Sequence, residues 1–220
     1  MHIRSVAQLR EYERIVDRIA RDAPGHVLDW GAGYGQIVHM LRERGVQASA
    51  ADYGPTSVPP EERYADVEIT LADDPVSLPW PDSTFDAVLS LGVLEHVQFP
   101  ERSLDEVRRI LRPGGTFYCY KLPNRWSYLE WIAKHAGLYY HGAYDHDRLY
   151  TRRSARELVE AHGFRITELR HANVLPLSVP GRVGDRIGPA LWALNRLLSP
   201  VPGIRCIATN VELVAVTAAP

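Results

Sequence analysis

Three glycines within five residues mark the stretch HVLDWGAGYGQIVHML, residues 26–41. An apolar run precedes Gly31, Gly33 and Gly35, and a helical pattern follows them. Glycines at such a place let a ligand come close to the backbone. The candidate ligands are a dinucleotide, another phosphate compound, and a ligand that carries adenosine without phosphate.

The spacing of these glycines argues against a phosphate ligand. A dinucleotide loop has the pattern G-x-G-x-x-G, and its third glycine would fall on Gln36. The phosphate loop G-x-x-x-x-G-K-[ST] is absent, because no lysine follows the glycines. The loop is therefore expected to approach a ligand with little or no phosphate.

Acidic residues stand at or after the ends of three expected strands. They are Asp29, Asp52, and the neighbouring Asp73 and Asp74. A carboxylate after the second strand can accept hydrogen bonds from both hydroxyls of a ribose. An acidic group after the third strand can meet an adenine amino group. Together the three strand ends predict a ribonucleoside pocket.

The elements that must position these residues alternate along the first half of the chain. Apolar runs predict strands over 26–30, 46–52, 67–71, 85–90 and 116–122. Amphipathic patterns predict helices over 4–22, 35–44 and 101–111. The alternation predicts an α/β, doubly wound, mostly parallel sheet with helices on both faces. Ligands of such sheets bind beyond the carboxyl ends of the strands, where the glycines stand.

The second half of the chain is less regular. We expect a helix over 151–162 with a Ser154–Glu157 capping box, a strand over 164–172, a helix near 188–198 and a last strand over 207–218. No internal repeat interrupts the pattern, so residues 1–220 are predicted to form one domain. Residues 123–150 and 173–205 are interpreted as insertions into it.

Bulk properties exclude several function classes. The net charge of −2 gives no indication of a nucleic-acid partner. Cys119 and Cys206 form no CxxC pair, so neither a disulfide scaffold nor a zinc site is expected. The N-terminal stretch lacks the apolar region of a signal peptide, and no run of about 18 apolar residues occurs. A cytoplasmic location is expected.

The stretch VLDWGAGYG resembles motif I of the class I S-adenosylmethionine-dependent methyltransferases, D-x-G-x-G-x-G. The similarity continues through LPWPDSTFDAVLS, VLEHV and LDEVRRILRPGGTFY, and covers residues 25–122. It resembles the small-molecule, methyltransferase-11-like branch, which includes ubiquinone-pathway-like O-methyltransferases. Four motifs in order at the family's spacing make the resemblance specific. It implies a seven-stranded sheet in the order 3-2-1-4-5-7-6 with the last strand antiparallel.

The resemblance also implies S-adenosylmethionine as the cofactor and roles for the matched positions. Asp29 and the glycine loop would hold the methionine part, and Asp52 the ribose. Asp73 or Asp74 would meet the adenine, and the Ser90 carbonyl the ammonium group. The N-terminal helix, within 1–24, is expected to cover this site. The cofactor-binding residues are then expected to be Asp29, Gly31, Ala32, Gly33, Asp52, Tyr53, Asp73, Asp74, Ser90 and Tyr12.

Two histidines are candidates for a catalytic base. A sulfonium methyl is already activated, so the protein must mainly align the reacting atoms. A hydroxyl acceptor also needs a base, which histidine can provide, whereas a carboxylate acceptor needs none. His96 follows the fourth strand, and the alternative for it is a structural role in the wall of the site. His146 is the second candidate.

His146 belongs to the cluster His141, Asp145, His146 and Asp147. The cluster could set up a base, ligate a metal, or form a polar loop before the next helix. Ubiquinone-pathway enzymes carry a metal-binding E-x-x-E-H pattern near His96. Here Gly92 stands at the first acid, so no metal site is predicted.

The two insertions are expected to face the acceptor, since functional variation concentrates on loops. The predicted substrate-binding residues are Asn124, Arg125, Trp126, Trp131, Tyr140, His141 and Tyr144. The aromatic residues among them could wall an acceptor or only pack a lid onto the core. Insertion 173–205 could contact a membrane or a lipid-like acceptor, be buried, or form a dimer contact, which leaves a monomer and a homodimer open.

The sequence therefore predicts a methyltransferase acting on a small molecule, with a hydroxyl or carboxylate oxygen preferred as acceptor. The tetrad [ND]-P-P-[YF], typical of many nitrogen methyltransferases, is replaced here by Ser90-Leu91-Gly92-Val93. Carbon or nitrogen methylation of a natural product or lipid-like acceptor stays open. A nicotinamide-dependent oxidoreductase and a non-catalytic cofactor-binding module are the rival functions from different classes.

Overall fold

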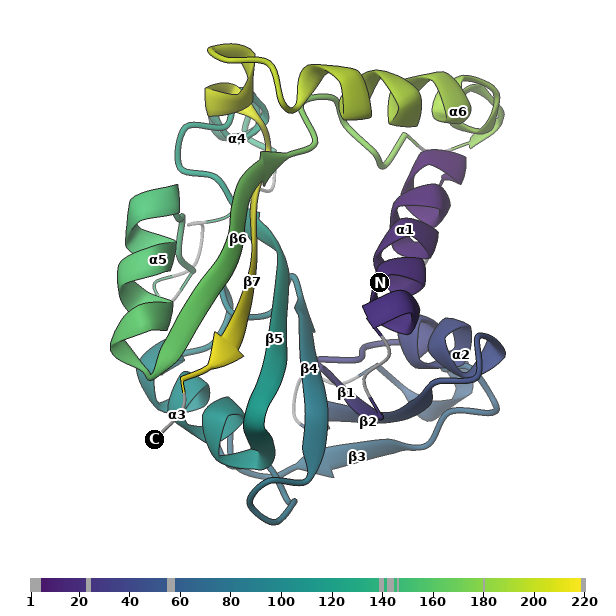
Figure 1. The fold of residues 1–220 in the computed structure, drawn as a ribbon. Coiled ribbons are helices and arrows are strands. Elements are labelled where there is room, and N and C mark those ends of the chain that lie inside the picture. The colour runs from purple at the N-terminus through teal and green to yellow at the C-terminus, as the bar shows by residue number, and fades with distance from the viewer. Residues whose placement is uncertain are drawn as a thin grey trace.

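The computed structural model describes residues 5–22, 25–54, 58–138, 141, 145, 147–179 and 181–218. Its strands are β1 (His26–Trp30), β2 (Gln47–Tyr53), β3 (Ile69–Ala72), β4 (Phe85–Leu91), β5 (Leu111–Pro123), β6 (Phe164–Ala172) and β7 (Asn210–Thr217). They form one sheet in the order β3-β2-β1-β4-β5-β7-β6 (Figure 1). Strand β7 is antiparallel to β5 and β6, and the remaining pairs are parallel. The predicted fold class, strand order and antiparallel last strand are confirmed.

Helices cover both faces of this sheet. They are α1 (Val6–Asp22), α2 (Gln36–Glu43), α3 (Pro100–Ile110), α4 (Tyr128–His135), α5 (Arg152–Ala161) and α6 (Gly181–Leu198). Helices α1 and α2 pack on one face in a core that includes Ile15, Leu41 and Leu89. Helices α3 and α5 pack on the other face with Val107 and Val159. Alternate strand residues point to opposite faces, so the inner strands β1, β2, β4, β5 and β7 contribute to both cores.

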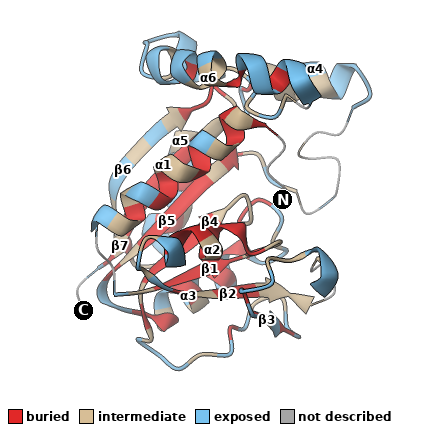
Figure 2. Ribbon diagram, turned by 90° about the vertical axis from the view of Figure 1, so that its right-hand side faces the viewer, coloured by how far each residue is buried: buried red, intermediate tan, exposed pale blue. Residues whose placement is uncertain are grey.

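Helix α1 shows how the amphipathic pattern produces this packing. Its apolar side chains, Tyr12, Ile15, Val16 and Ile19, are at most 1% exposed. They recur at intervals of three and four residues, which places them on one side of a helix. Figure 2 shows this buried side turned toward the strands. Fully burying one such side chain stabilises the fold by roughly 1.5–3 kcal/mol, so the helix is held by its inner face.

Two helices differ from the sequence expectation. Helix α4 was given no bounds from the sequence, and α6 begins at Gly181, earlier than the helix predicted near 188–198. The capping box of α5 is also one turn earlier than predicted. Thr151 is its N-cap, and Ser154 stands at the third helical position, where its side chain accepts from the Thr151 backbone.

Helices α4 and α6 lie beyond the carboxyl edge of the sheet, on the side where α1 begins (Figure 1). Gly188 allows α6 to approach α1 closely, since a Cβ there would lie 3.0 Å from the backbone nitrogen of Ala7. Trp192 of α6 donates a hydrogen bond of 3.3 Å to Glu11 of α1. Among the described residues, no helix is both long and apolar enough to cross a membrane.

Candidate active site

The glycine loop follows β1 and is tied to the next strand. The backbone N–H groups of Gly31 and Ala32 both donate to the carbonyl of Ala51, at 2.9 Å. Gly31 has a φ of 78°, a left-handed conformation that favours glycine. A Cβ at Gly31 would also lie 2.3 Å from Cγ2 of Val93. The loop is therefore bare because both its conformation and its close neighbour require it.

Asp52 lies beside this loop near the end of β2. Its Oδ2 accepts a hydrogen bond of 3.2 Å from the Gly33 N–H. Its Oδ1 accepts one of 2.8 Å from the Tyr53 N–H. These bonds fix the carboxylate at the carboxyl edge of the sheet, where open α/β sheets bind ligands.

A cavity of about 640 Å³ opens at this edge. Its lining comes from the ends of β1 and β2, from the loop after β4, and from the segment before α5. The lining residues are Trp30, Gly31, Asp52, Tyr53, Pro75, Val93, His96, Val97, Gln98 and Asp147. We call this space the cofactor cavity.

Asp29 lies inside the fold, next to the cofactor cavity rather than in its lining. It is 2% exposed. Burial, with a further contribution from the charge of Asp52, raises the pKa of Asp29 to about 7. A buried carboxyl with such a pKa changes charge near neutral pH, which is a frequent property of functional sites.

Six further predicted cofactor residues are not in the lining of this cavity. Two of them, Ala32 and Gly33, belong to the glycine loop beside it. Ser90 is fully buried in β4 opposite Trp30, and Tyr12 is buried in the core under α1. Asp73 is exposed. Asp74 accepts backbone hydrogen bonds from Val76 and Ser77, at 2.8 and 2.7 Å, so its carboxylate caps a local turn. Their cofactor contacts stay predictions.

His96 forms a pair with Asp147 at the mouth of the cofactor cavity. Its Nδ1 lies 3.0 Å from Oδ1 of Asp147. The Asp147 side chain is 1% exposed, whereas that of His96 is 40% exposed. When Asp147 is ionised it accepts a hydrogen bond from the Nδ1–H group of His96, which leaves Nε2 as the nitrogen that can take up another proton. His96 was predicted from the sequence as a base, but Asp147 was not predicted as its partner.

A second cavity of about 430 Å³ adjoins the first, and Gly31 and His96 line both. The residues that line only the second cavity come mainly from the end of β4 with the loop after it and from the segments next to β6 and β7, with single residues from β5 and α4. They are Leu91, Gly92, Glu95, Lys121, Leu129, His141, Asn173, Pro176, Leu177, Ser178, Thr209 and Asn210. We call this space the acceptor cavity. It combines apolar walls with polar groups, as small-molecule sites commonly do.

Titratable groups gather in the acceptor cavity. Burial raises the pKa of Glu95 to about 7. Burial alone would lower the pKa of His141, but the hydrogen bond to Glu130 and the charges of Glu95 and Asp147 outweigh it and raise that pKa. Glu95, His96 and His141 each offer a donor atom, and these atoms lie within 4.8 Å of one another. This geometry suits proton exchange or a metal ion, and the absence of a metal stays a prediction.

Two residues of the acceptor cavity have unusual backbone conformations. Lys121 has a φ of 63° and Asn173 a φ of 61°, values that are uncommon outside glycine. The pairing of β5 with β7 shifts register between Cys119 and Leu122, so Lys121 lies at a β-bulge. Bulges re-aim side chains next to active sites. The Lys121 Nζ donates to the hydroxyl of Tyr12, at 2.9 Å.

The predicted substrate residues have different outcomes. His141 lines the acceptor cavity. Asn124 is fully buried, and its Nδ2 donates to the carbonyls of Cys206 and Ala208, so it ties β5 to the segment before β7. The remaining described residues, Arg125, Trp126 and Trp131, are exposed. Tyr140, Tyr144 and the second candidate base, His146, lie outside the described residues.

The sequence missed several residues of the acceptor cavity, including Leu129, Lys121 and Asn173. Leu129 lies between Trp126 and Trp131, both more than 60% exposed. A helix that begins at Tyr128 turns Leu129 inward while Trp131 faces solvent. If the bounds of that helix had been predicted, Leu129 would have been assigned to its inner side and the two tryptophans to its outer side. No local sequence pattern predicts the bulge at Lys121.

Comparisons with known proteins bear on the family and the fold. A family model described as a methyltransferase domain matches residues 3–169. Demethylmenaquinone methyltransferase of Thermus thermophilus is 34% identical over 124 residues, which are 53% of this chain and 56% of that protein. Sterol 4-C-methyltransferase strm-1 of Caenorhabditis elegans is 26% identical over 114 residues, 49% of this chain and 34% of that protein. The chain thus spans about half the length, or less, of these relatives.

A solved structure shares the fold over nearly the whole chain. It is the 1,6-didemethyltoxoflavin-N1-methyltransferase of Burkholderia thailandensis with bound 1,6-didemethyltoxoflavin and S-adenosylhomocysteine. The TM-score is 0.61, the identity is 20%, and the match covers 97% of this chain and 79% of that one. At this identity the similarity establishes the fold alone.

Proposed function

This chain belongs to the methyltransferase family whose domain model spans residues 3–169, and on that premise we propose that it methylates an oxygen atom of a small-molecule acceptor. The family and the fold make it a class I S-adenosylmethionine-dependent methyltransferase. The acceptor and its reacting atom are the proposed part.

One observation carries the choice of oxygen. His96 lines both cavities, and a buried carboxylate, Asp147, lies 3.0 Å from its Nδ1. A histidine oriented in this way can accept a proton through Nε2. It stands where a donor in one cavity and an acceptor in the other would meet. A hydroxyl acceptor needs such a base, and we therefore favour a hydroxyl over a carboxylate.

The residues of the cofactor cavity fit a nucleoside that carries a positive charge in place of phosphate. The bare backbone at Gly31 leaves room that a Cβ would fill, and Asp52 offers carboxylate oxygens beside it for ribose hydroxyls. Asp29 would face the positive charge of the methionine part. When bound there, S-adenosylmethionine supplies an activated methyl group.

The chain's own contribution is alignment and proton removal. The walls of the acceptor cavity hold the acceptor near His96, and alignment of two reactants is worth roughly 7–11 kcal/mol of the barrier. His96 takes the hydroxyl proton at Nε2 while Asp147 stabilises the imidazolium through Nδ1. Such general base catalysis contributes typically about 10²–10⁴-fold.

The acceptor class follows from the mixed lining of the acceptor cavity. Leu91, Leu129 and Leu177 offer apolar contact, while polar groups such as Lys121 and Asn210 can fix orientation. We propose an acceptor with an apolar body and a hydroxyl group. The names of two relatives refer to a quinone and a sterol, which supports an apolar acceptor. The second name specifies carbon, so carbon methylation is the second candidate.

A mass-spectrometric screen tests the proposal. The protein is incubated with S-adenosylmethionine carrying a deuterated methyl group and a panel of phenols, alcohols, carboxylic acids, amines and carbon nucleophiles. We expect a labelled methyl ether from hydroxyl acceptors. Transfer only to nitrogen or carbon contradicts the oxygen assignment. Cofactor binding without transfer to any acceptor favours the binding module, and stronger thermal stabilisation by NAD than by S-adenosylmethionine favours the oxidoreductase.

A further inference from the structure

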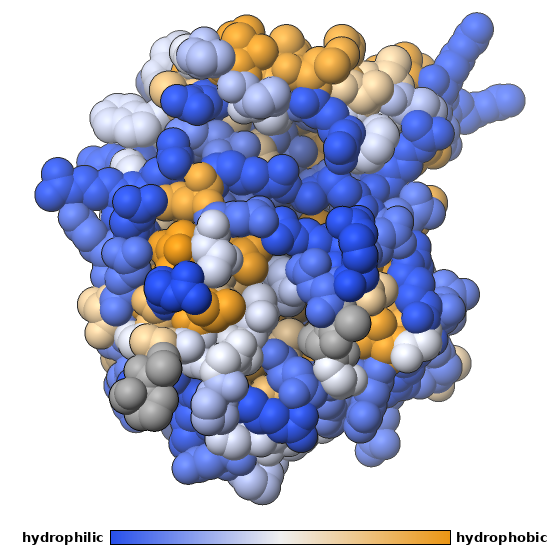
Figure 3. Space-filling view, in the orientation of Figure 1, coloured by the Kyte–Doolittle hydropathy of each residue, from blue (hydrophilic) through white to orange (hydrophobic). Residues whose placement is uncertain are grey.

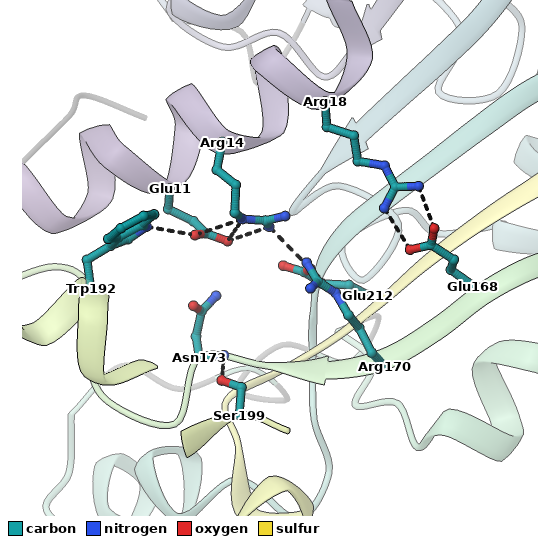
Figure 4. A network of polar contacts seen from close by, with 9 residues as sticks. All are labelled: Glu11, Arg14, Arg18, Glu168, Arg170, Asn173, Trp192, Ser199 and Glu212. Carbon is teal, nitrogen blue, oxygen red and sulfur yellow. Dashed lines mark hydrogen bonds and ion pairs between the residues drawn. The ribbon is translucent and has the colours of Figure 1, made fainter. Parts of the chain in front are cut away.

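A third cavity of about 330 Å³ lies at the end of β6, and its lining comes from α1, β6, α6, the first residue of α5 and the segment after α6. Its lining includes five arginines from several elements. They are Arg14, Arg152, Arg170, Arg196 and Arg205. Among the described lining residues, Glu11 alone is acidic, and the buried Glu212 lies beneath. Figure 4 shows the inner part of this arrangement, where side chains from α1, β6, β7 and α6 converge.

The two acids are occupied by the two inner arginines. Arg14 bonds Glu11 through Nε and Nη2, with a shortest contact of 2.6 Å. Arg170 donates to Oε2 of Glu212 at 2.7 and 3.1 Å. The same Oε2 lies 3.4 Å from Arg14. These contacts pair both carboxylates with arginines, while the second oxygen of Glu212, Oε1, has no hydrogen-bond partner among the described residues.

The positive charges of the three other arginines of the cavity, called the outer arginines, are not neutralised by carboxylates of the described residues. Arg152, Arg196 and Arg205 form no ion pair with any described residue. The guanidinium of Arg196 lies 5.2 Å from the ring centroid of Trp192, a contact that leaves its charge uncompensated. Three positive charges thus share one cavity without a counter-charge from the described part of the chain, an arrangement that favours an anion.

Buried polar atoms in the same cavity point to a bound ligand. Asn173 is 5% exposed, and its Nδ2 has no hydrogen-bond partner among the described residues. Figure 4 shows its amide directed into the space between Glu11 and Arg170. The Nε of Arg152 and the Nδ1 of His171 also lack partners in the described part of the chain. Buried polar groups are normally hydrogen-bonded. The N–H groups of Asn173 and Arg152 are therefore available to donate hydrogen bonds to a ligand.

We propose that this arginine cavity binds a phosphate-bearing anion. Guanidinium groups match the geometry of phosphate oxygens and donate in pairs, and the unpartnered Asn173 amide adds a neutral donor. Burial and the charges of Arg152 and Arg205 lower the pKa of His171, which agrees with a positive field at this place. The described lining of the cofactor cavity contains no arginine, so the two sites select different ligands.

Two sources can supply the phosphate. One is a phosphorylated soluble compound. The other is the headgroup of an acidic phospholipid, because exposed apolar side chains are next in sequence to Arg196 and Arg205 of the cavity or within two residues of them. Leu197, Ile204 and Ile207 are at least 36% exposed, and Figure 3 shows apolar surface along the edge where α6 lies in Figure 1. The shared chemistry is a phosphate group held by guanidinium groups.

The first arm of the test is calorimetric titration with inorganic pyrophosphate at constant ionic strength. We expect saturable binding at one site per chain. Arg152→Ala and Arg205→Ala should each weaken it about tenfold or more, since hydrogen bonds between charged groups are strong. Arg153→Ala is the matched control. Arg153 neighbours Arg152 on α5 but pairs with Glu157, and its side chain is 87% exposed. Circular dichroism and the unfolding midpoint of each variant check folding.

The second arm uses phosphatidylcholine vesicles with and without phosphatidic acid. Sedimentation that requires phosphatidic acid, is competed by pyrophosphate and is lost in Arg152→Ala and Arg205→Ala identifies the lipid headgroup. Pyrophosphate binding without sedimentation identifies a soluble phosphate. The proposal fails if neither probe binds, if Arg152→Ala and Arg205→Ala bind pyrophosphate as the parent does, or if the control Arg153→Ala weakens pyrophosphate binding equally. Vesicle binding that none of the three substitutions changes contradicts the lipid headgroup as the source.

Discussion

The buried carboxyl of Asp29 allows a quantitative prediction about stability and pH. Burial, and then the charge of Asp52, raise its pKa from 3.8 to about 7. Below pH 3.8 the carboxyl holds its proton in the folded and the unfolded chain. Between that pH and about 7 the folded chain keeps the proton while the unfolded chain loses it. This group therefore favours unfolding increasingly as the pH rises, and the effect is complete above pH 7.

The expected magnitude follows from the size of the shift. A carboxyl whose pKa is 3.8 when unfolded and about 7 when folded reduces the free energy of unfolding by about 4 kcal/mol at high pH. Asp29→Asn preserves the shape of the side chain and removes the titration. The variant should therefore gain stability relative to the parent as the pH rises from 5 to 8.

Urea unfolding at pH 5, 6, 7 and 8 measures this difference. We expect the free energy of unfolding of Asp29→Asn, relative to the parent, to rise by a few kcal/mol across the range. Asp82→Asn is a control because Asp82 is largely exposed and should shift the curve little. Parallel pH profiles for the parent and Asp29→Asn, or a gap that widens toward low pH, would refute the reasoning.

Further predictions concern the site. His96→Ala should reduce kcat by about 10²–10⁴-fold while S-adenosylhomocysteine affinity is retained. Asp147→Asn should lower kcat in the same direction. If single-turnover transfer survives both substitutions, His96 has a structural role in the wall of the site and is not the base. Gly31→Ala should destabilise the fold by roughly 2–5 kcal/mol, through its left-handed φ and the clash with Val93. Gly45→Ala, with a φ of 76° and nothing near its Cβ, should cost only roughly 1–2 kcal/mol in urea unfolding. Dialysis against EDTA should leave transfer unchanged, and activity restored only by added metal would contradict this.

The fold was predictable because its signals are local. Strand β6 spans Phe164–Ala172, the same range that the alternating pattern predicts. The strand order itself came from the family resemblance and not from periodicity. Helix α4 was not delimited from the sequence, because it has no buried residue and its bounds are therefore not marked by an inner apolar face. Its cap was visible nonetheless, since Ser127 accepts from the Glu130 N–H and the pair fits the S-x-x-E signature.

The candidate site was predictable only where strand ends define it. Gly31 and Asp52 follow β1 and end β2, so their position at one edge follows from the parallel sheet. The pairing of His96 with Asp147 joins residues 51 positions apart, and no spacing rule brings them together. The arginine cavity likewise depends on how α6 packs against α1. These contacts arise from tertiary packing of the insertions, which the sequence pattern does not predict.

Calorimetric titration with S-adenosylhomocysteine tests the central claim, that the cofactor cavity beside Gly31 and Asp52 holds the sulfonium nucleoside. We predict saturable binding at one site per chain. Asp52→Ala should weaken binding about tenfold or more, because a charged acceptor of ribose hydroxyls is lost. A well-folded protein that binds neither S-adenosylhomocysteine nor S-adenosylmethionine, or an Asp52→Ala variant that binds as the parent does, would contradict the account.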